Sequence, residues 1–256
     1  MIARLLLVNA VALLVYMSIW FLVARSRNRL DLVDAAWGSG FALVAWLVVL
    51  QKPSGHSLLL AVLVTIWSAR LTYHIAERLR RRHDPRYELM GSKWKGNYWL
   101  RAYGLVYMLQ GFIVWVITIP IVLAGGRQDL PSATAFFAVA GTIIWILGFV
   151  FEAIADKQLR DFVINKANKG RVMDKGLWAW SRHPNYFGEL VLWYGIAVFG
   201  FSAAYGYLGL IGPIALSAII ILVSGIPPIE TRKKDDPEYQ KYVRKTSVLI
   251  PMPPRS

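Results

Sequence analysis

The chain contains no cysteine, and this absence excludes several kinds of chemistry. Without thiols it has no disulfide framework, no thiolate nucleophile and no cysteine-ligated metal. The GxGxxG and Walker patterns are also absent, so a nucleotide is not expected to be bound by a Rossmann or P-loop domain. No internal repeat or low-complexity linker divides the 256 residues, which we therefore expect to form one domain.

Acidic residues are scarce, with 15 Asp and Glu against 29 Lys and Arg, so the net charge is +14. Such a charge could suit nucleic acid, but the basic residues lie between apolar runs and not on an exposed domain. The hydrophobic fraction of 56% and the mean hydropathy of +0.44 are high for a soluble protein. We therefore expect a membrane protein with no nucleic-acid partner.

The apolar runs predict an all-α polytopic membrane protein with seven transmembrane helices and short cytoplasmic helices. The first run is too long for a signal peptide and has no small-residue cleavage site, so we expect it to span the membrane. The predicted spans are residues 2–24, 35–50, 57–75, 103–124, 134–155, 187–205 and 206–226.

The loop charges predict the orientation of these spans. If the N-terminus lies outside, 25 of the 29 Lys and Arg residues fall on one side of the membrane. The other side then holds only Arg4, Lys52 and Arg127, and Arg70 lies within the third span. The positive-inside rule makes the rich side, which includes the C-terminus, cytoplasmic. The expected location is a bacterial inner membrane.

The first candidate catalytic residue is Asp34, in the stretch DLVDAAWG at 31–38. We expect Asp31 to be an ordinary helix-capping residue at the start of span two. Asp34 and Trp37 lie three residues apart and enter the apolar segment together. An ionisable residue inside a membrane span is a functional candidate by default.

The stretch GLWAWSRHPNYFGELVLW at 176–193 predicts a polar-ligand site at the edge of a span. Ser181 can cap the next helix, and Pro184 suits its first turn. Backbone N–H groups at a helix start favour anions. The polar side chains near that start are Arg182, His183, Asn185 and Glu189.

A second polar stripe lies at the end of span five, where Glu152, Asp156 and Arg160 are spaced by four. Two carboxylates at that spacing repel each other unless a cation or donor is shared. We expect this stripe to face the start of span six.

The C-terminal segment contains three structural signals. Pro227–Pro228 is predicted to end the last membrane helix. Asp236–Pro237 predicts a new helix start, with Tyr239 and Tyr242 on one face. The proline-rich end is not expected to be helical.

Six segments in chain order match a known pattern: LVDAAWG, WSARLTYHI, HDPRYELM, FEAIADKQLRDF, KGLWAWSRHPNYFGE and IETRKKDDPEYQKYVRKTSVLIP. Together they resemble the steroid 5α-reductase superfamily, and in particular its bacterial branch of unknown function. The stretch SRHPNYFGE is also similar to sterol reductases and to isoprenylcysteine carboxyl methyltransferase.

The resemblance implies a seven-helix enzyme that holds NADPH near its last membrane helices, roughly within residues 150–256, with the pocket open to the cytoplasm. Arginines suit phosphates, and carboxylates suit ribose hydroxyls. No metal is implied. The implied cofactor residues are Asp156, Arg160, Arg182, His183, Asn185, Tyr186, Glu189, Arg232, Tyr239 and Tyr242.

The sequence departs from this family at the proton donor. Its steroid reductases place a Glu on span two and a Tyr on span three, where this chain has Asp34 and Trp67. Tryptophan is not an acid, so Asp34 is the expected donor, with Tyr73 or Tyr107 as alternatives.

Three functions follow. The first is NADPH-dependent reduction of an activated C=C in a steroid-like or other lipid substrate. The second is methyl transfer from S-adenosylmethionine, which needs fewer phosphate-binding cations. A transporter ranks last because no repeat symmetry or pair of broken helices indicates one.

Overall fold

The chain folds into two compact helical units. The computed structural model describes residues 1–81, 83–126, 132–201 and 205–255, and these ranges contain helices and one isolated β-bridge. Unit 1 comprises Met1–Ala135 with Gly200–Gly212, and unit 2 comprises Phe136–Phe199 with Pro213–Ser256. The all-α prediction is confirmed. The expected cofactor region lies within unit 2.

Six helical segments in the described residues are long and apolar enough to cross a membrane, as an integral membrane protein requires. The predicted span 187–205 corresponds to α10 (Pro184–Gly200), which has 17 residues. The count of seven spans therefore stays a prediction. Arg127, assigned to an outer loop, lies outside the described residues.

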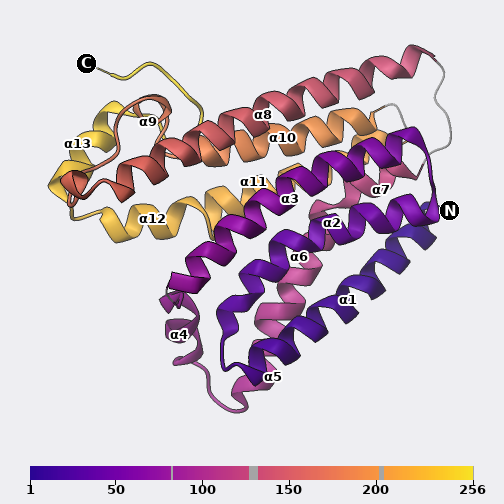
Figure 1. Cartoon of the computed structure of the whole chain (residues 1–256), viewed down its shortest axis with the longest axis horizontal. Coiled ribbons are helices and arrows are strands. Elements are labelled where there is room, and N and C mark those ends of the chain that lie inside the picture. Colours follow the sequence, from indigo (N-terminus) through magenta and orange to yellow (C-terminus); the bar gives the residue numbers. More distant parts are fainter. Residues whose placement is uncertain (82, 127–131, 202–204, 256) are drawn as a thin grey trace. The chain divides into compact units, whose positions relative to one another are not determined.

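Unit 1 begins with helices that run side by side (Figure 1). A small residue allows the helix that contains Gly38 to pack closely against the helix that contains Thr72. A Cβ built on Gly38 would lie 2.5 Å from Thr72 Oγ1. Ser68 Oγ also donates to the Gly38 carbonyl. The elements are α1 (Ile2–Ser26), η1 (Leu30–Leu32), α2 (Val33–Gln51) and α3 (Gly55–Arg81).

The predicted span 103–124 is not one continuous helix. It is divided into a π-helical turn and two α-helices, which separate at Thr118. Pro120 causes the break, because proline donates no N–H and its ring clashes with the preceding turn. Around this segment, unit 1 contains α4 (Pro85–Gly91), α5 (Tyr98–Ala102), η2 (Tyr103–Met108), α6 (Leu109–Ile117), α7 (Ile119–Gly125) and η4 (Gly206–Leu210).

Unit 2 is built around α8 and α10, which lie side by side (Figure 1). Its elements are α8 (Ser132–Ile164), η3 (Lys166–Asn168), α9 (Leu177–Trp180), α10, α11 (Ile211–Leu222), α12 (Ile226–Lys233) and α13 (Pro237–Lys245).

Four glycines allow the α8 and α10 backbones to touch. A Cβ on Gly141 would lie 2.5 Å from the Gly195 carbonyl oxygen, and a Cβ on Gly148 would lie 2.5 Å from the Leu192 nitrogen. A Cβ on Gly188 would lie 2.6 Å from the Glu152 nitrogen. Small residues are a usual means of close helix contact in membranes.

The C-terminal predictions are partly confirmed. Asp236 caps α13 by accepting from the Glu238 and Tyr239 N–H groups, and Pro237 lies in the first turn. The helix α11 ends at Leu222, before the two prolines, and the sixth candidate span continues through α12 to Lys233. Pro227–Pro228 does not end a helix but lies in the first turn of α12, where a missing N–H costs nothing.

Candidate functional site

Each unit contains a cluster of interacting polar side chains. In unit 1 the cluster is centred on Asp34, whose side chain is 14% exposed. Tyr87 Oη donates to Asp34 Oδ1 at 2.5 Å, and Arg78 Nη2 donates to Oδ2 at 2.6 Å. Arg86 Nη2 also donates to Oδ2, at 3.3 Å. Gln110 Nε2 in turn donates to Tyr87 Oη at 3.3 Å.

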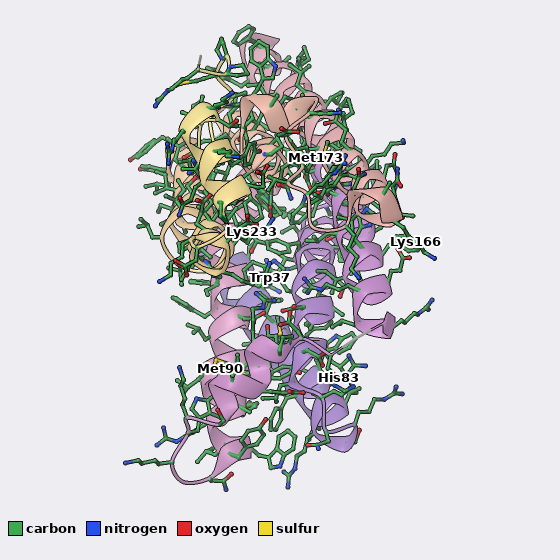
Figure 2. All side chains as sticks on the ribbon, turned by 90° about the vertical axis from the view of Figure 1, so that its left-hand side faces the viewer. Trp37, His83, Met90, Lys166, Met173 and Lys233 are labelled. Atoms are coloured by element: carbon green, nitrogen blue, oxygen red, sulfur yellow. The ribbon has the colours of Figure 1, made fainter. Side chains whose placement is uncertain are left out.

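Two further carboxylates, those of Asp84 and Asp31, hold the start of α4 in place. Asp84 caps α4 by accepting from the Arg86 backbone N–H, and Arg86 Nη2 also reaches Asp84 Oδ2 at 2.7 Å. Contrary to the expectation from the sequence, Asp31 does not cap α2 but accepts from Arg29 and from the Asp84 backbone N–H, at 2.8 and 3.1 Å. Burial would raise the pKa of Asp84, but the hydrogen bonds from Arg86 outweigh it and lower the value. Figure 2 labels His83, just before α4.

The surroundings of Tyr87 and Asp34 favour different protonation states for the two side chains. Burial, and then the Asp34 charge, raise the pKa of the Tyr87 phenol well above its ordinary value, so Tyr87 stays protonated. Asp34 accepts hydrogen bonds from two guanidiniums, which stabilise its ionised form. The phenol of Tyr87 therefore carries the proton of this hydrogen-bonded pair, and the Asp34 carboxylate accepts the hydrogen bond.

Sequence reasoning did not select Tyr87. It lies on α4, after span three, whereas the resemblance directed attention to span three itself. The segment HDPRYELM contained the signal. The two alternatives are less suitable: Tyr107 is buried and donates to the Leu30 carbonyl, and Tyr73 is 63% exposed.

The cluster in unit 2 is centred on Glu230, which sequence reasoning also missed. Its Oε1 atom lies 3.0 Å from Arg182 Nε, 3.0 Å from His183 Nε2 and 2.8 Å from Tyr239 Oη. Arg182 and His183 come from the turn before α10, whereas Glu230 and Tyr239 come from α12 and α13. The carboxylate therefore ties the two C-terminal helices to the start of α10.

Arg182 is buried, with 8% exposed, and is committed to protein partners. Its Nη1 atom donates to the Val243 and Thr246 carbonyls at 3.1 and 3.3 Å. Tyr242 Oη donates to the Trp178 carbonyl at 2.6 Å. Two predicted cofactor residues, Arg182 and Tyr242, thus hold α13 in place.

Ser181 acts differently from an N-cap of α10. Its Oγ accepts from the His183 N–H and donates to the Leu249 carbonyl, at 3.1 and 2.7 Å. It therefore anchors the C-terminal tail, and the tail packs against α9, where Met252 N donates to the Trp180 carbonyl. Pro184 begins α10 as predicted.

The other predicted cofactor residues lie on α8, α10 and α12. Glu152 contacts Gly188 through the backbone, which places the α8 stripe beside the first turns of α10. Within that region four side chains are half-buried and two are exposed. The half-buried ones are Asp156, Asn185, Tyr186 and Glu189, and the exposed ones are Arg160 and Arg232.

A cavity of about 520 Å³ opens beside Glu230, between α12 and α13. Its lining includes two cations, Lys234 and Arg244, and two uncharged polar side chains, Thr231 and Gln240. The cations suit a phosphate, and the hydroxyl and amide groups suit sugar hydroxyls. Glu230 and Tyr239 also line this cavity.

Burial lowers the pKa of His183 below its ordinary value, although the Glu230 carboxylate acts in the opposite direction. The imidazole is therefore neutral at pH 7. It also stacks on Tyr186, with ring centroids 5.6 Å apart. No group of metal ligands occurs among the described residues.

Comparison with known proteins identifies the family. A family model described as "Protein of unknown function (DUF1295)" matches residues 20–246, so the chain belongs to that family, which is linked to steroid 5α-reductase-like membrane proteins. An uncharacterized protein of Schizosaccharomyces pombe is 27% identical over 193 residues, or 62% of this chain. The chain matches 55% of the length of that relative. No solved structure matches.

Proposed function

We propose that this DUF1295 family member is a membrane-embedded reductase. It transfers a hydride from NADPH to an activated C=C next to a carbonyl, in a steroid-like or other lipid substrate. The observation that carries the proposal is the hydrogen-bonded pair of Tyr87 and Asp34, at 2.5 Å. The steroid reductases that the sequence resembles use a tyrosine and a carboxylate to polarise the substrate carbonyl, and here α4 supplies the tyrosine.

The residues of unit 1 take distinct roles. When substrate binds, the Tyr87 hydroxyl turns from Asp34 to the substrate carbonyl oxygen and donates its proton there. The Gln110 amide, which donates to the phenol oxygen, orients the ring. Asp34 holds Tyr87 in place, and its own charge is balanced by Arg78 and Arg86. In this role Asp34 is a positioning residue, and Tyr87 is the catalytic acid.

Unit 2 supplies groups that fit the cofactor. Lys234 and Arg244 would hold phosphates, and Thr231 and Gln240 would bind ribose hydroxyls. The half-buried Asp156, Asn185, Tyr186 and Glu189 offer further polar contacts. When bound, NADPH supplies the hydride. Arg182, His183, Tyr239 and Tyr242 support this binding indirectly, by fixing α12 and α13.

Tyr87→Phe tests the acid directly. Turnover is measured as NADPH oxidation with a panel of enone lipids, and NADPH binding is measured separately by equilibrium dialysis. Removal of a general acid lowers turnover by about 10²–10⁴-fold, while NADPH affinity should be retained. The matched control is Tyr73→Phe, at an exposed tyrosine. Wild-type turnover in Tyr87→Phe would reject Tyr87 as the acid.

Asp34→Asn separates the positioning role from the catalytic one. The amide oxygen of this variant can still accept a hydrogen bond from Tyr87, but the side chain no longer carries the negative charge that pairs with Arg78. Turnover should fall less than in Tyr87→Phe, and its pH dependence should shift.

The choice of cofactor has a separate test. Equilibrium dialysis of the purified protein with NADPH and with S-adenosylmethionine distinguishes the reductase from the methyltransferase. Saturable binding of NADPH supports the proposal. Saturable binding of S-adenosylmethionine alone would assign the chain to methyl transfer.

A further inference from the structure

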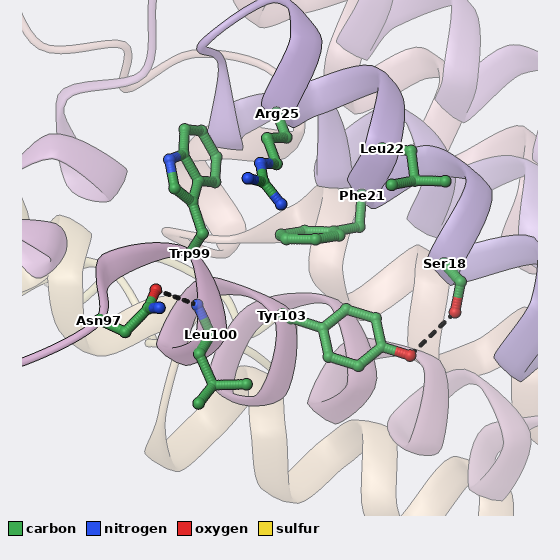
Figure 3. A pocket seen from close by; sticks show the side chains of 8 residues that line it. All are labelled: Ser18, Phe21, Leu22, Arg25, Asn97, Trp99, Leu100 and Tyr103. Carbon is green, nitrogen blue, oxygen red and sulfur yellow. Dashed lines mark hydrogen bonds between the residues drawn. The ribbon is translucent and has the colours of Figure 1, made fainter.

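A cavity of about 490 Å³ lies beside the C-terminal end of α1, and none of its lining residues belongs to the Asp34 cluster. Figure 3 shows Arg25 of α1 directed into it, next to Phe21 and Trp99. Ser18 Oγ and Tyr103 Oη form a hydrogen bond at 2.9 Å along its wall. The cavity thus combines a cation and hydroxyl groups with aromatic rings.

A second cavity, of about 380 Å³, follows the same helices toward the N-terminal half of α1. Its lining is apolar apart from the Trp115 indole, and it includes Leu14, Met17 and Phe112. Gly111 provides the space: a Cβ built there would lie 2.9 Å from Met17 Cγ. A larger side chain at this position would fill this cavity.

The two cavities lie in succession along α1, and together they are called the groove. The lining residues on α1 recur at helical spacing, so they share one face of the helix. Partner residues come from α5 and η2 at the first cavity and from η2 and α6 at the second. The α1 lining residues are Ala10, Leu13, Leu14, Met17, Ser18, Phe21, Leu22 and Arg25.

The charged side chain that lines this groove is Arg25, at the end nearest the C-terminus of α1. No carboxylate lines either cavity, and no ion pair of Arg25 occurs within the described part of the chain. The groove length along α1 is about 22 Å at 1.5 Å per residue. One leaflet of a bilayer has an acyl region of about 15 Å, so the groove matches one lipid chain together with its headgroup.

We propose that this groove binds an anionic phospholipid, with its phosphate at Arg25 and one acyl chain along Met17, Gly111 and Phe112. Arg25 supplies charge complementarity, and Trp99 and Tyr103 lie where aromatic residues meet lipid headgroups. None of the residues proposed for reduction lines either cavity.

The test uses the full chain purified in a neutral detergent and native mass spectrometry, with phosphatidylglycerol or phosphatidylcholine added at equal concentrations. Phosphatidylglycerol should bind at least tenfold more tightly. Arg25→Gln should remove about a tenfold share of that preference, and Arg25→Lys should restore most of it. Arg27→Gln is the matched control, because Arg27 follows the same helix end but lines neither cavity.

Two further arms identify what is recognised. Gly111→Leu should weaken binding of both lipids by filling the groove, and its thermal unfolding shows whether the variant is folded. Glycerol phosphate, the headgroup without acyl chains, should not compete at millimolar concentration. Equal retention of the two lipids, equal effects of Arg25→Gln and Arg27→Gln, or competition by glycerol phosphate would each overturn the proposal.

Discussion

Arg182→Ala separates two roles for this arginine, because the sequence indicates a phosphate ligand whereas the structure shows a structural clamp. The side chain is 8% exposed, and it donates to Glu230 and to the Val243 and Thr246 carbonyls. Truncation to alanine removes one charged hydrogen bond and leaves two carbonyls without this donor.

The magnitude follows from burial. Removal of one partner of a buried ion pair costs about 3–5 kcal/mol, because the remaining charge loses its counter-charge. Glu230 keeps His183 and Tyr239 and is 24% exposed, so the lower half of that range is expected. At about 2–4 °C per kcal/mol, the unfolding midpoint should fall by roughly 6–16 °C.

Thermal unfolding in detergent measures this loss, with Arg232→Ala as the control at an exposed arginine of α12. Adding Glu230→Gln completes a double-mutant cycle, in which a coupling energy of about 0.5–3 kcal/mol between positions 182 and 230 is expected. If Arg182→Ala unfolds within 2 °C of the wild type but binds NADPH tenfold more weakly, the clamp interpretation is wrong and Arg182 is a ligand.

Three further outcomes are expected. The folded-state pKa of His183 lies below the unfolded value of about 6.5. The neutral imidazole therefore stabilises the fold above pH 6.5, and this contribution is lost as the pH falls through the folded-state pKa. His183→Gln should flatten this pH dependence of the unfolding midpoint. Gly188→Ala should cost about 1–3 kcal/mol by overpacking α8 against α10, whereas Gly104→Ala, with open space at Cβ, should not destabilise. The chain has no cysteine of its own, so Lys52→Cys and Lys93→Cys each introduce a single labelling site. The two sites should be labelled from opposite sides of the membrane, and labelling from the same side would refute the topology.

The local signals in the sequence were reliable where neighbouring residues decide the outcome. Asp236 and Pro237 begin α13 because capping and proline geometry act within one helical turn. The apolar runs became long helices because hydrocarbon leaves backbone groups no alternative partner. Pro227–Pro228 was misread as a helix end because proline is favourable in a first turn as well as disruptive inside a helix.

The candidate site was predicted only in part. Asp34 could be selected because an acid entering an apolar run is conspicuous, and Arg182 and His183 because they precede a helix start. Their partners could not be selected, because Tyr87 and Glu230 lie in polar segments where such residues are ordinary. The resemblance suggested a tyrosine on span three, but the tyrosine that reaches Asp34 comes from α4.

The sequence alone therefore determined the membrane class, the helical fold and the region of each polar cluster, because these depend on hydropathy and on spacing within a helix. The tertiary structure decided which charges meet. Whether Arg182 can take a phosphate depends on Glu230, 48 residues away in the chain, and whether Asp34 is paired with a phenol depends on the fold of α4, 53 residues away. Such pairings are set by how helices pack, and packing between distant segments leaves no periodic trace in a single sequence.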